Sequence, residues 1–119
     1  MTQAESRLRV RKQDDVTIIE FVDRNILDEA NIQQIGAEIG SLIDSGEADK
    51  LVISFSNVDH LSSAALGTLI TIHNKLKAQG GKLRLTNIDP QIYEVFAITK
   101  LNKLFDIRET LDDAVASFE

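Results

Sequence analysis

Short apolar runs alternate along this chain with longer segments in which apolar residues recur at helical spacing. The stretch "LRVRKQDDVTIIEFV", residues 8–22, predicts two strands joined by a turn at Asp14 and Asp15. Ile18 and Ile19 are consecutive, which indicates that the second strand is buried on both faces. The runs "KLVISFS" (50–56) and "KLRLTN" (82–87) predict two further buried strands, and a last short strand is expected around residues 105–107.

Two long segments carry the period of an amphipathic helix. Their apolar positions are Ile32, Ile35, Ile39, Leu42 and Ile43 in the first, and Leu66, Leu69, Ile70 and Leu76, together with His73, in the second. Asp28 is placed to cap the first helix, which is expected to end at Ser45 and Gly46. The pair Gly80-Gly81 is expected to close the second helix.

Two shorter helices are marked by the residues that begin them. Asp89 followed by Pro90 is a favourable cap and first-turn pair, and Thr110 is in a position to cap a final helix. The inward positions expected on these helices are Ile92, Val95 and Phe96, then Leu111, Val115 and Phe118, and Tyr93 is also predicted to be a core residue.

The order of these elements predicts the fold class. Two strands are followed by alternating helices and strands, which is typical of an α/β sheet with parallel crossover connections and a cover of helices. No linker rich in proline and glycine divides the chain, so we expect one domain that covers residues 1–119.

Composition and charge narrow the classes of function. The chain has 119 residues, a formal net charge of −6 and no cysteine. The acidic balance argues against nucleic-acid binding, and without cysteine neither disulfides nor thiolate metal sites are expected. The polar N-terminus lacks the apolar core of a secretory leader, and no apolar run approaches the roughly 18 residues of a membrane span. We therefore expect a cytoplasmic protein with no membrane partner.

The stretch "DHLSSAALGTL", residues 59–69, has two adjacent serines where a buried strand gives way to a helix. Ser62 and Ser63 are therefore expected at a helix N-terminus beyond the carboxyl end of a strand, where modifications and ligands of open α/β sheets usually lie. Serine is a preferred N-cap, so capping alone would explain one of them. A phosphoryl group is also tolerated there, and it would add about −1.5 to −2 charges. A serine at this place suits a reversible charge switch.

Catalysis at these serines is not expected. A catalytic serine needs a base and an orienting acid in fixed geometry, and no G-x-S-x-G elbow is present. There is no P-loop and no G-x-G-x-x-G motif, and the sequence next to Ser63 offers only Asp59 and His60 to a nucleotide. We predict no enzyme activity, no cofactor and no metal site. His73 is expected to be a partly buried packing residue.

The block "NVDHLSSAALGTLITIHNKLKAQGGKLRLTNIDPQIYEVFAITKLNKLF", residues 57–105, resembles the STAS domain of bacterial anti-sigma factor antagonists, and the likeness in element order covers nearly the whole chain. The resemblance implies a small, mixed, mostly parallel sheet with helices packed mainly on one face. It also implies a binding module without catalysis of its own. In that family the unphosphorylated form binds a serine-kinase anti-sigma factor and releases a sigma factor. Phosphorylation abolishes this binding, and a serine phosphatase restores it.

The family begins its second helix with aspartate, the phosphoacceptor serine, a second small hydroxyl residue, glycine, leucine and glycine. Aligned on Leu66-Gly67, the resemblance puts Ser62 at the aspartate, Ser63 at the phosphoacceptor, Ala64 at the second hydroxyl and Ala65 at the first glycine. Ser62 in place of aspartate removes a charge and adds a second acceptor. Ser63 is therefore the predicted phosphorylation site, with Ser62 as the alternative.

The predicted partner surface consists of Asp59, His60, Leu61, Ser62, Ser63, Ala64, Leu66 and Gly67, with the strand–helix loop near residues 23–28 beside it. The departures at Ser62, Ala64 and Ala65 leave a second hypothesis open. In that hypothesis the chain is a non-switched STAS module, either a scaffold or an adaptor subunit in a signalling or lipid-transport complex. The sequence does not fix an oligomeric state.

Overall fold

The main sheet has five strands, of which only the first runs antiparallel to its neighbour. The computed structural model describes residues 8–22, 24–26, 29–46 and 48–118. The strands lie in the order β1-β2-β4-β6-β7, namely β1 (Leu8–Gln13), β2 (Val16–Phe21), β4 (Lys50–Ser54), β6 (Lys82–Thr86) and β7 (Asp106–Arg108). β1 pairs antiparallel with β2, and all other neighbours pair in parallel. Asp14 and Asp15 form the predicted turn, and Asp14 has a positive φ of 57°.

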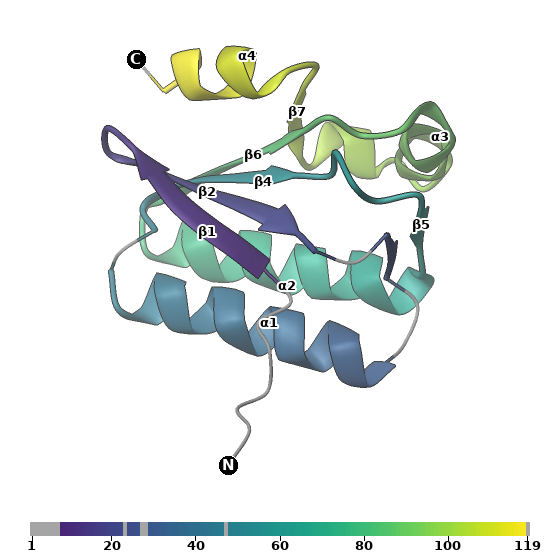
Figure 1. Cartoon of the computed structure of the whole chain (residues 1–119), viewed down its shortest axis with the longest axis horizontal. Coiled ribbons are helices and arrows are strands. Elements are labelled where there is room, and N and C mark those ends of the chain that lie inside the picture. The colour runs from purple at the N-terminus through teal and green to yellow at the C-terminus, as the bar shows by residue number, and fades with distance from the viewer. Residues whose placement is uncertain (1–7, 23, 27–28, 47, 119) are drawn as a thin grey trace.

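Helices cover the two faces of this sheet unequally (Figure 1). α1 (Glu29–Asp44) and α2 (Ser63–Ala78) lie side by side against one face, and α4 (Leu111–Ala116) lies on the other. α3 (Pro90–Ile98) and the 3₁₀ turn Leu101–Lys103 lie at one end of the sheet. The predicted α/β class is confirmed, because the sheet is mixed but mostly parallel and the helices pack mainly on one face.

β2 is buried on both faces, as its consecutive isoleucines predict. Ile19 belongs to the large core beneath α1 and α2, and Ile18 to a small core beneath α4; both are 0% exposed. The small core consists of Val16, Ile18, Val52 and Ala114, with Leu111, Val115 and Phe118 packed against it. The inward face predicted for the last helix is therefore confirmed, and Ala114 is added to it.

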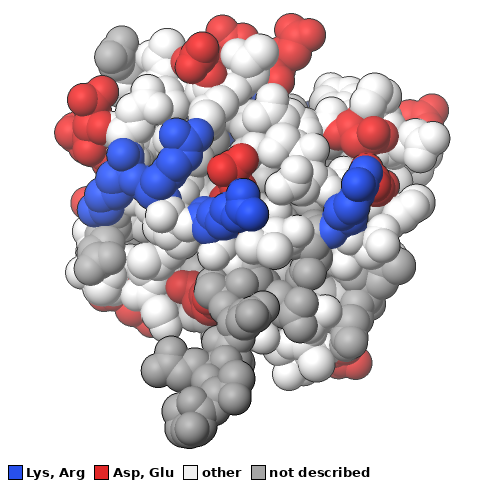
Figure 2. Space-filling view, in the orientation of Figure 1, with Lys and Arg blue, Asp and Glu red and all other residues white. Residues whose placement is uncertain are grey.

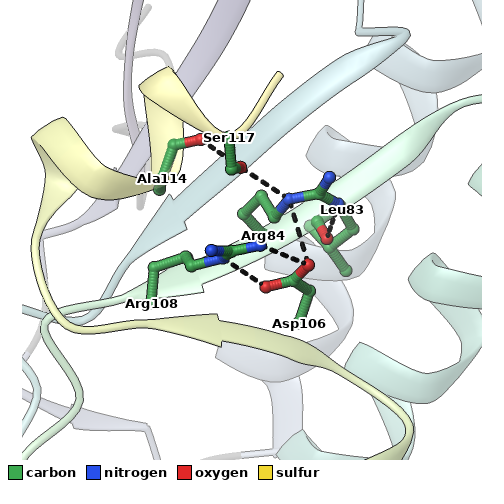
Figure 3. A network of polar contacts seen from close by, with 6 residues as sticks. All are labelled: Leu83, Arg84, Asp106, Arg108, Ala114 and Ser117. Atoms are coloured by element: carbon green, nitrogen blue, oxygen red, sulfur yellow. Dashed lines mark hydrogen bonds and ion pairs between the residues drawn. The ribbon is translucent and has the colours of Figure 1, made fainter. Parts of the chain in front are cut away.

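A polar network joins the C-terminal helix to β6 and β7 (Figure 3). Arg84 Nε donates to Ser117 Oγ at 2.8 Å and lies 3.3 Å from Asp106 Oδ2. The Arg84 guanidinium also lies over the ring of Phe118, with Cζ 4.6 Å from the centroid. Arg108 contacts both oxygens of the same Asp106 carboxylate, at 2.6 and 3.2 Å. This face of the sheet therefore combines a small apolar core with charged contacts.

Most predicted helix ends are confirmed. Asp89 caps α3 with Pro90 in its first turn, and Thr110 caps α4. Gly80 follows α2 with a φ of 80°, which closes the helix in the left-handed conformation that glycine favours. α1 ends at Asp44, and its expected cap, Asp28, lies outside the described residues.

The predicted core of α3 is partly wrong. Tyr93 and Val95 are expected as core residues from their helical spacing, but they are 42% and 39% exposed. α3 lies at the end of the sheet and buries only the narrow face that carries Ile92 and Phe96. Helical periodicity alone does not give the width of the covered face.

His73 of α2 is half-buried, as predicted. Its ring packs against Phe105 with the ring centroids 5.4 Å apart. Burial, and secondarily the nearby charge of Lys77, lowers the pKa of His73 below its usual value. The buried stripe of α2 also includes Ile72, which the apolar pattern did not single out.

Candidate functional site

Two loops meet at the start of α2. The short strands β3 (Asn25–Ile26) and β5 (His60–Leu61) pair in parallel, and Ser62 N donates to Ile26 O at 3.0 Å. This pair was not predicted, because strands of two residues carry no hydrophobic period. It attaches the segment before α2 to the loop after β2, so the first residues of α2 are held from outside the helix as well as from within it.

Arg24 and Asp59 strengthen the same junction. Asp59 N donates to Arg24 O at 2.7 Å, and Arg24 Nε forms an ion pair with Asp59 Oδ2 at 2.9 Å. The two side chains are 75% and 46% exposed, so this pair contributes at most about 1 kcal/mol. The sequence analysis expected the loop of residues 23–28 beside this site but missed the contact of Arg24 with Asp59, because 35 positions separate the two and no local pattern joins them.

Ser62 is the N-cap of α2. Its backbone is extended, with φ −82° and ψ 165°, and its Oγ accepts a hydrogen bond from Ala65 N at 3.2 Å. This is the usual geometry of a serine cap, in which the side chain accepts from the third residue of the helix. The hydroxyl of Ser62 is therefore already engaged in holding the helix start.

Ser63 is the first residue of α2, and it is exposed. Within the described part of the chain, its hydroxyl makes no hydrogen bond. The free N–H groups and the positive end of the helix dipole lie at this terminus, an environment that favours an anion. The two adjacent serines therefore differ: Ser62 caps the helix, and Ser63 presents a free hydroxyl to solvent.

The other residues of the predicted partner surface do not all face outward. Ala64 and Gly67 are exposed, and Gly67 lies on the same helix face as Ser63, one turn further along; His60 is exposed on β5. Leu61 and Asp59 are half-buried. Leu66 is different, because its side chain is 7% exposed and belongs to the large core. Leu66 therefore packs in the core beneath the predicted partner surface and is not part of its exposed face.

Two other kinds of functional feature are absent from the described residues. In this part of the chain, no group of three or more His, Cys, Asp or Glu side chains is placed to hold a metal ion. No described helix has the length and apolarity needed to cross a membrane. What the arrangement at α2 offers chemically is a free hydroxyl on a fixed, partly apolar surface.

The family model of the STAS domain matches residues 7–114. The chain is 28% identical over 96 residues to BtrV of Bordetella bronchiseptica, which is described as an anti-sigma factor antagonist. This alignment covers 81% of the chain and 82% of BtrV. The similarity therefore extends over most of both proteins.

Two solved structures show the same fold. An anti-sigma factor antagonist (STAS) domain protein from Planctomyces limnophilus has a TM-score of 0.84 at 22% identity, over 98% of this chain and 100% of that one. The Bacillus cell fate determinant SpoIIAA, in its phosphorylated form, has a TM-score of 0.73 at 19% identity, over 94% and 99%. At these identities the likeness shows the fold, which is that of STAS domains.

Proposed function

The chain belongs to the STAS domain family, and we propose that it is an anti-sigma factor antagonist switched by phosphorylation of Ser63. The unphosphorylated domain, residues 1–119 as one unit, binds a serine-kinase anti-sigma factor in the cytoplasm and thereby frees a sigma factor. The kinase phosphorylates Ser63 and the complex separates. A serine phosphatase then restores the binding form. The domain itself is a substrate and a binding module, not an enzyme.

The observation that carries this proposal is the difference between the two serines. Ser63 is exposed, and its hydroxyl has no hydrogen-bond partner among the described residues, so a kinase can reach it without breaking a contact in that part of the domain. Ser62 Oγ is 3.2 Å from Ala65 N and serves as the cap. Modification of Ser62 would disturb that hydrogen bond, whereas modification of Ser63 would leave it in place.

A phosphoryl group on Ser63 would change charge more than structure. It adds about −1.5 to −2 charges to a surface where the serine was neutral. The helix N-terminus favours this charge, so α2 stays folded. A partner that packs closely on Ser63, Ala64 and Gly67 would instead have to bury the new charge or withdraw from it.

The surroundings of Ser63 supply the rest of the proposed partner surface. Ala64 and Gly67 leave the helix face flat, and β5 places His60 and Leu61 next to the helix start. The pairing of β3 with β5, together with the Arg24–Asp59 ion pair, holds these segments in one arrangement before any partner arrives. Such preorganisation reduces the conformational entropy lost on binding.

The test is phosphorylation by the cognate serine-kinase anti-sigma factor, with the site mapped by mass spectrometry. We expect phosphate on Ser63 in the wild type and none in Ser63→Ala. Ser63→Ala should bind the kinase as tightly as the wild type does, and Ser63→Asp should bind at least about tenfold more weakly, since it carries a charge into the contact. Ser62→Ala is the matched control, because it should still be phosphorylated. Phosphate on Ser62 alone, or unchanged binding by Ser63→Asp, would refute the proposal.

One observation favours a second candidate function, a non-switched STAS scaffold or adaptor subunit in a signalling or lipid-transport complex. Ser62 occupies the cap where the family resemblance has a charged aspartate, so a kinase that reads that charge would not recognise this helix start. This candidate predicts stable co-purification with a multi-protein complex and no phosphate on either serine. The same mass-spectrometry experiment distinguishes the two.

A further inference from the structure

A second surface, unrelated to Ser63, lies along the free edge of the sheet. β1 is the edge strand, and among the described residues no strand pairs with its outer side. We propose that this edge binds an extended segment of a partner protein, in which acidic and apolar residues alternate, as an additional strand.

The register of the β1–β2 hairpin gives the backbone groups that are open to such a strand. Gln13 and Val16 flank a two-residue turn, so they form the hydrogen-bonded pair that closes it. Pairing then alternates, so Arg11 and Arg9 also bond to β2, while Val10 and Lys12 direct their N–H and C=O groups away from it. An incoming strand would bond to Val10 and Lys12.

A hollow lies on one side of this edge, between β1 and α1, with a volume of about 390 Å³. Its lining combines the apolar side chains of Leu8, Val10 and Leu42 with the polar residues Glu38, Ser41 and Ser45. Val10 is 47% exposed, although it belongs to a strand and points toward the side of the sheet that α1 covers. A residue paired opposite Val10 would place its side chain in this hollow, so an apolar residue is favoured at that position.

Positive charge lies along the same strand. Figure 2 shows lysine and arginine side chains gathered over β1, on a protein whose net charge is −6. Arg9, Arg11 and Lys12 have no ion pair within the described part of the chain, whereas Lys50 and Lys75 each pair with an aspartate. Arg9 and Arg11 point to the sheet face opposite Val10, because side chains alternate along a strand.

These two features together define the occupant. A strand with an apolar residue opposite Val10 has its two neighbouring side chains beside Arg9 and Arg11, where acidic residues form opposite-charge pairs. A second copy of this chain is disfavoured, because antiparallel pairing of β1 with itself would bring these arginines against one another. The edge therefore selects an acidic–apolar–acidic segment and not its own sequence.

The probe for this surface is the peptide EVEVEVE, with KVKVKVK as the charge-reversed control, titrated into the ¹⁵N-labelled full chain. EVEVEVE should shift the amide signals of β1 at sub-millimolar concentration and slow hydrogen exchange at Val10 and Lys12, whereas KVKVKVK should do neither. Val10→Pro should abolish binding while the domain stays folded, because the lost N–H is not part of the β1–β2 ladder.

Charge is tested by a matched pair of double variants. The double variant Arg9→Glu with Arg11→Glu should weaken EVEVEVE binding by about tenfold or more. The control, Lys82→Glu with Lys103→Glu, changes the net charge by the same amount at exposed positions away from β1 and should have little effect on binding. Equal losses in both double variants, shifts away from β1, no shift at millimolar peptide, or self-association through β1 would each overturn the proposal. None of these outcomes depends on phosphorylation of Ser63.

Discussion

The two faces of the sheet are stabilised in different ways. One is covered by α1 and α2, of 16 residues each, over a core that includes Ile19, Ile39 and Leu69. The other is covered by α4, of six residues, over a core of four buried side chains, and by the network around Arg84. The first face depends on apolar burial, and the second depends also on charged contacts.

The difference has a consequence for function. α2, which carries Ser63, belongs to the face with the large core, so the candidate site is built on the most firmly packed part of the molecule. α4 lies on the opposite face and has few buried neighbours. Short helices with little apolar cover open locally at low free energy. We expect α4 to detach before α2 does.

Ile19 and Ile18 give the sharpest test of the comparison, since they are adjacent on β2 and both are 0% exposed. Ile19→Ala should lower the free energy of unfolding by about 4 kcal/mol, because α1 and α2 cannot close over the cavity. Ile18→Ala should cost only about 2 kcal/mol, because short α4 can settle toward the sheet. Urea unfolding of both variants measures the two losses. Equal losses would mean that the faces are equally rigid.

Arg84 tests the charged part of the α4 face. Its side chain is 13% exposed and contacts Ser117, Asp106 and Phe118. Arg84→Ala should therefore cost about 2 kcal/mol and remove hydrogen-exchange protection from α4 while leaving α2 protected. Arg108→Ala, which removes the more exposed arginine of the same network, is the control and should cost less. Simultaneous loss of protection in α2 and α4 would contradict the comparison.

The two serines test the site on the large-core face. Ser62→Ala removes the cap of α2 and should lower the free energy of unfolding by about 1 kcal/mol. Ser63→Ala removes a hydroxyl with no partner among the described residues. This change should alter the free energy of unfolding by less than about 0.5 kcal/mol. Thermal or urea unfolding of both variants separates them. A larger loss of stability for Ser63→Ala than for Ser62→Ala would mean that Ser63, and not Ser62, caps α2.

Of these predictions, the smallest expected effect is the pH dependence that His73 gives to the free energy of unfolding. Its pKa is lowered in the folded state, so the unfolded chain binds the proton more readily. Above a pH of about 6.5, the ordinary pKa of histidine, His73 is neutral in both states and its contribution to the free energy of unfolding is fully present. Below that pH, acidification should lower the free energy of unfolding until the pH has fallen through the folded pKa of His73. The difference in unfolding free energy between wild type and His73→Gln, measured at several pH values, isolates this residue from the carboxylates. A difference that does not change with pH would refute the lowered pKa of His73.

Local chemistry was sufficient to predict much of this fold. The consecutive isoleucines of β2 predicted burial on two faces, and Asp89-Pro90 and Thr110 predicted where α3 and α4 begin. Each of these signals is complete within a few neighbouring residues. Helical periodicity was less reliable for α3, because exposure of Tyr93 depends on where the helix lies relative to the sheet.

The candidate site was only partly predictable. The sequence located two serines at a helix start but left open which of them caps it, and the geometry of Ser62 answers that question. The pairing of β3 with β5 and the Arg24–Asp59 contact join segments about 35 residues apart. Pairings of this kind depend on tertiary structure, and a single sequence contains no local signal for them.

Buried side chains, and not the cap at Ser62, set the rotational phase of α2. Successive helix residues are turned by about 100° around the axis, and Ala65, Leu66 and Leu69 lock that rotation by pointing into the core. A helix that began one residue earlier on the same core would leave the outward direction of Ser63 unchanged, because buried side chains fix that direction. The position of the free hydroxyl is thus inherited from the hydrophobic pattern of residues 65–69, so a change of core residues there would redirect the site without touching either serine.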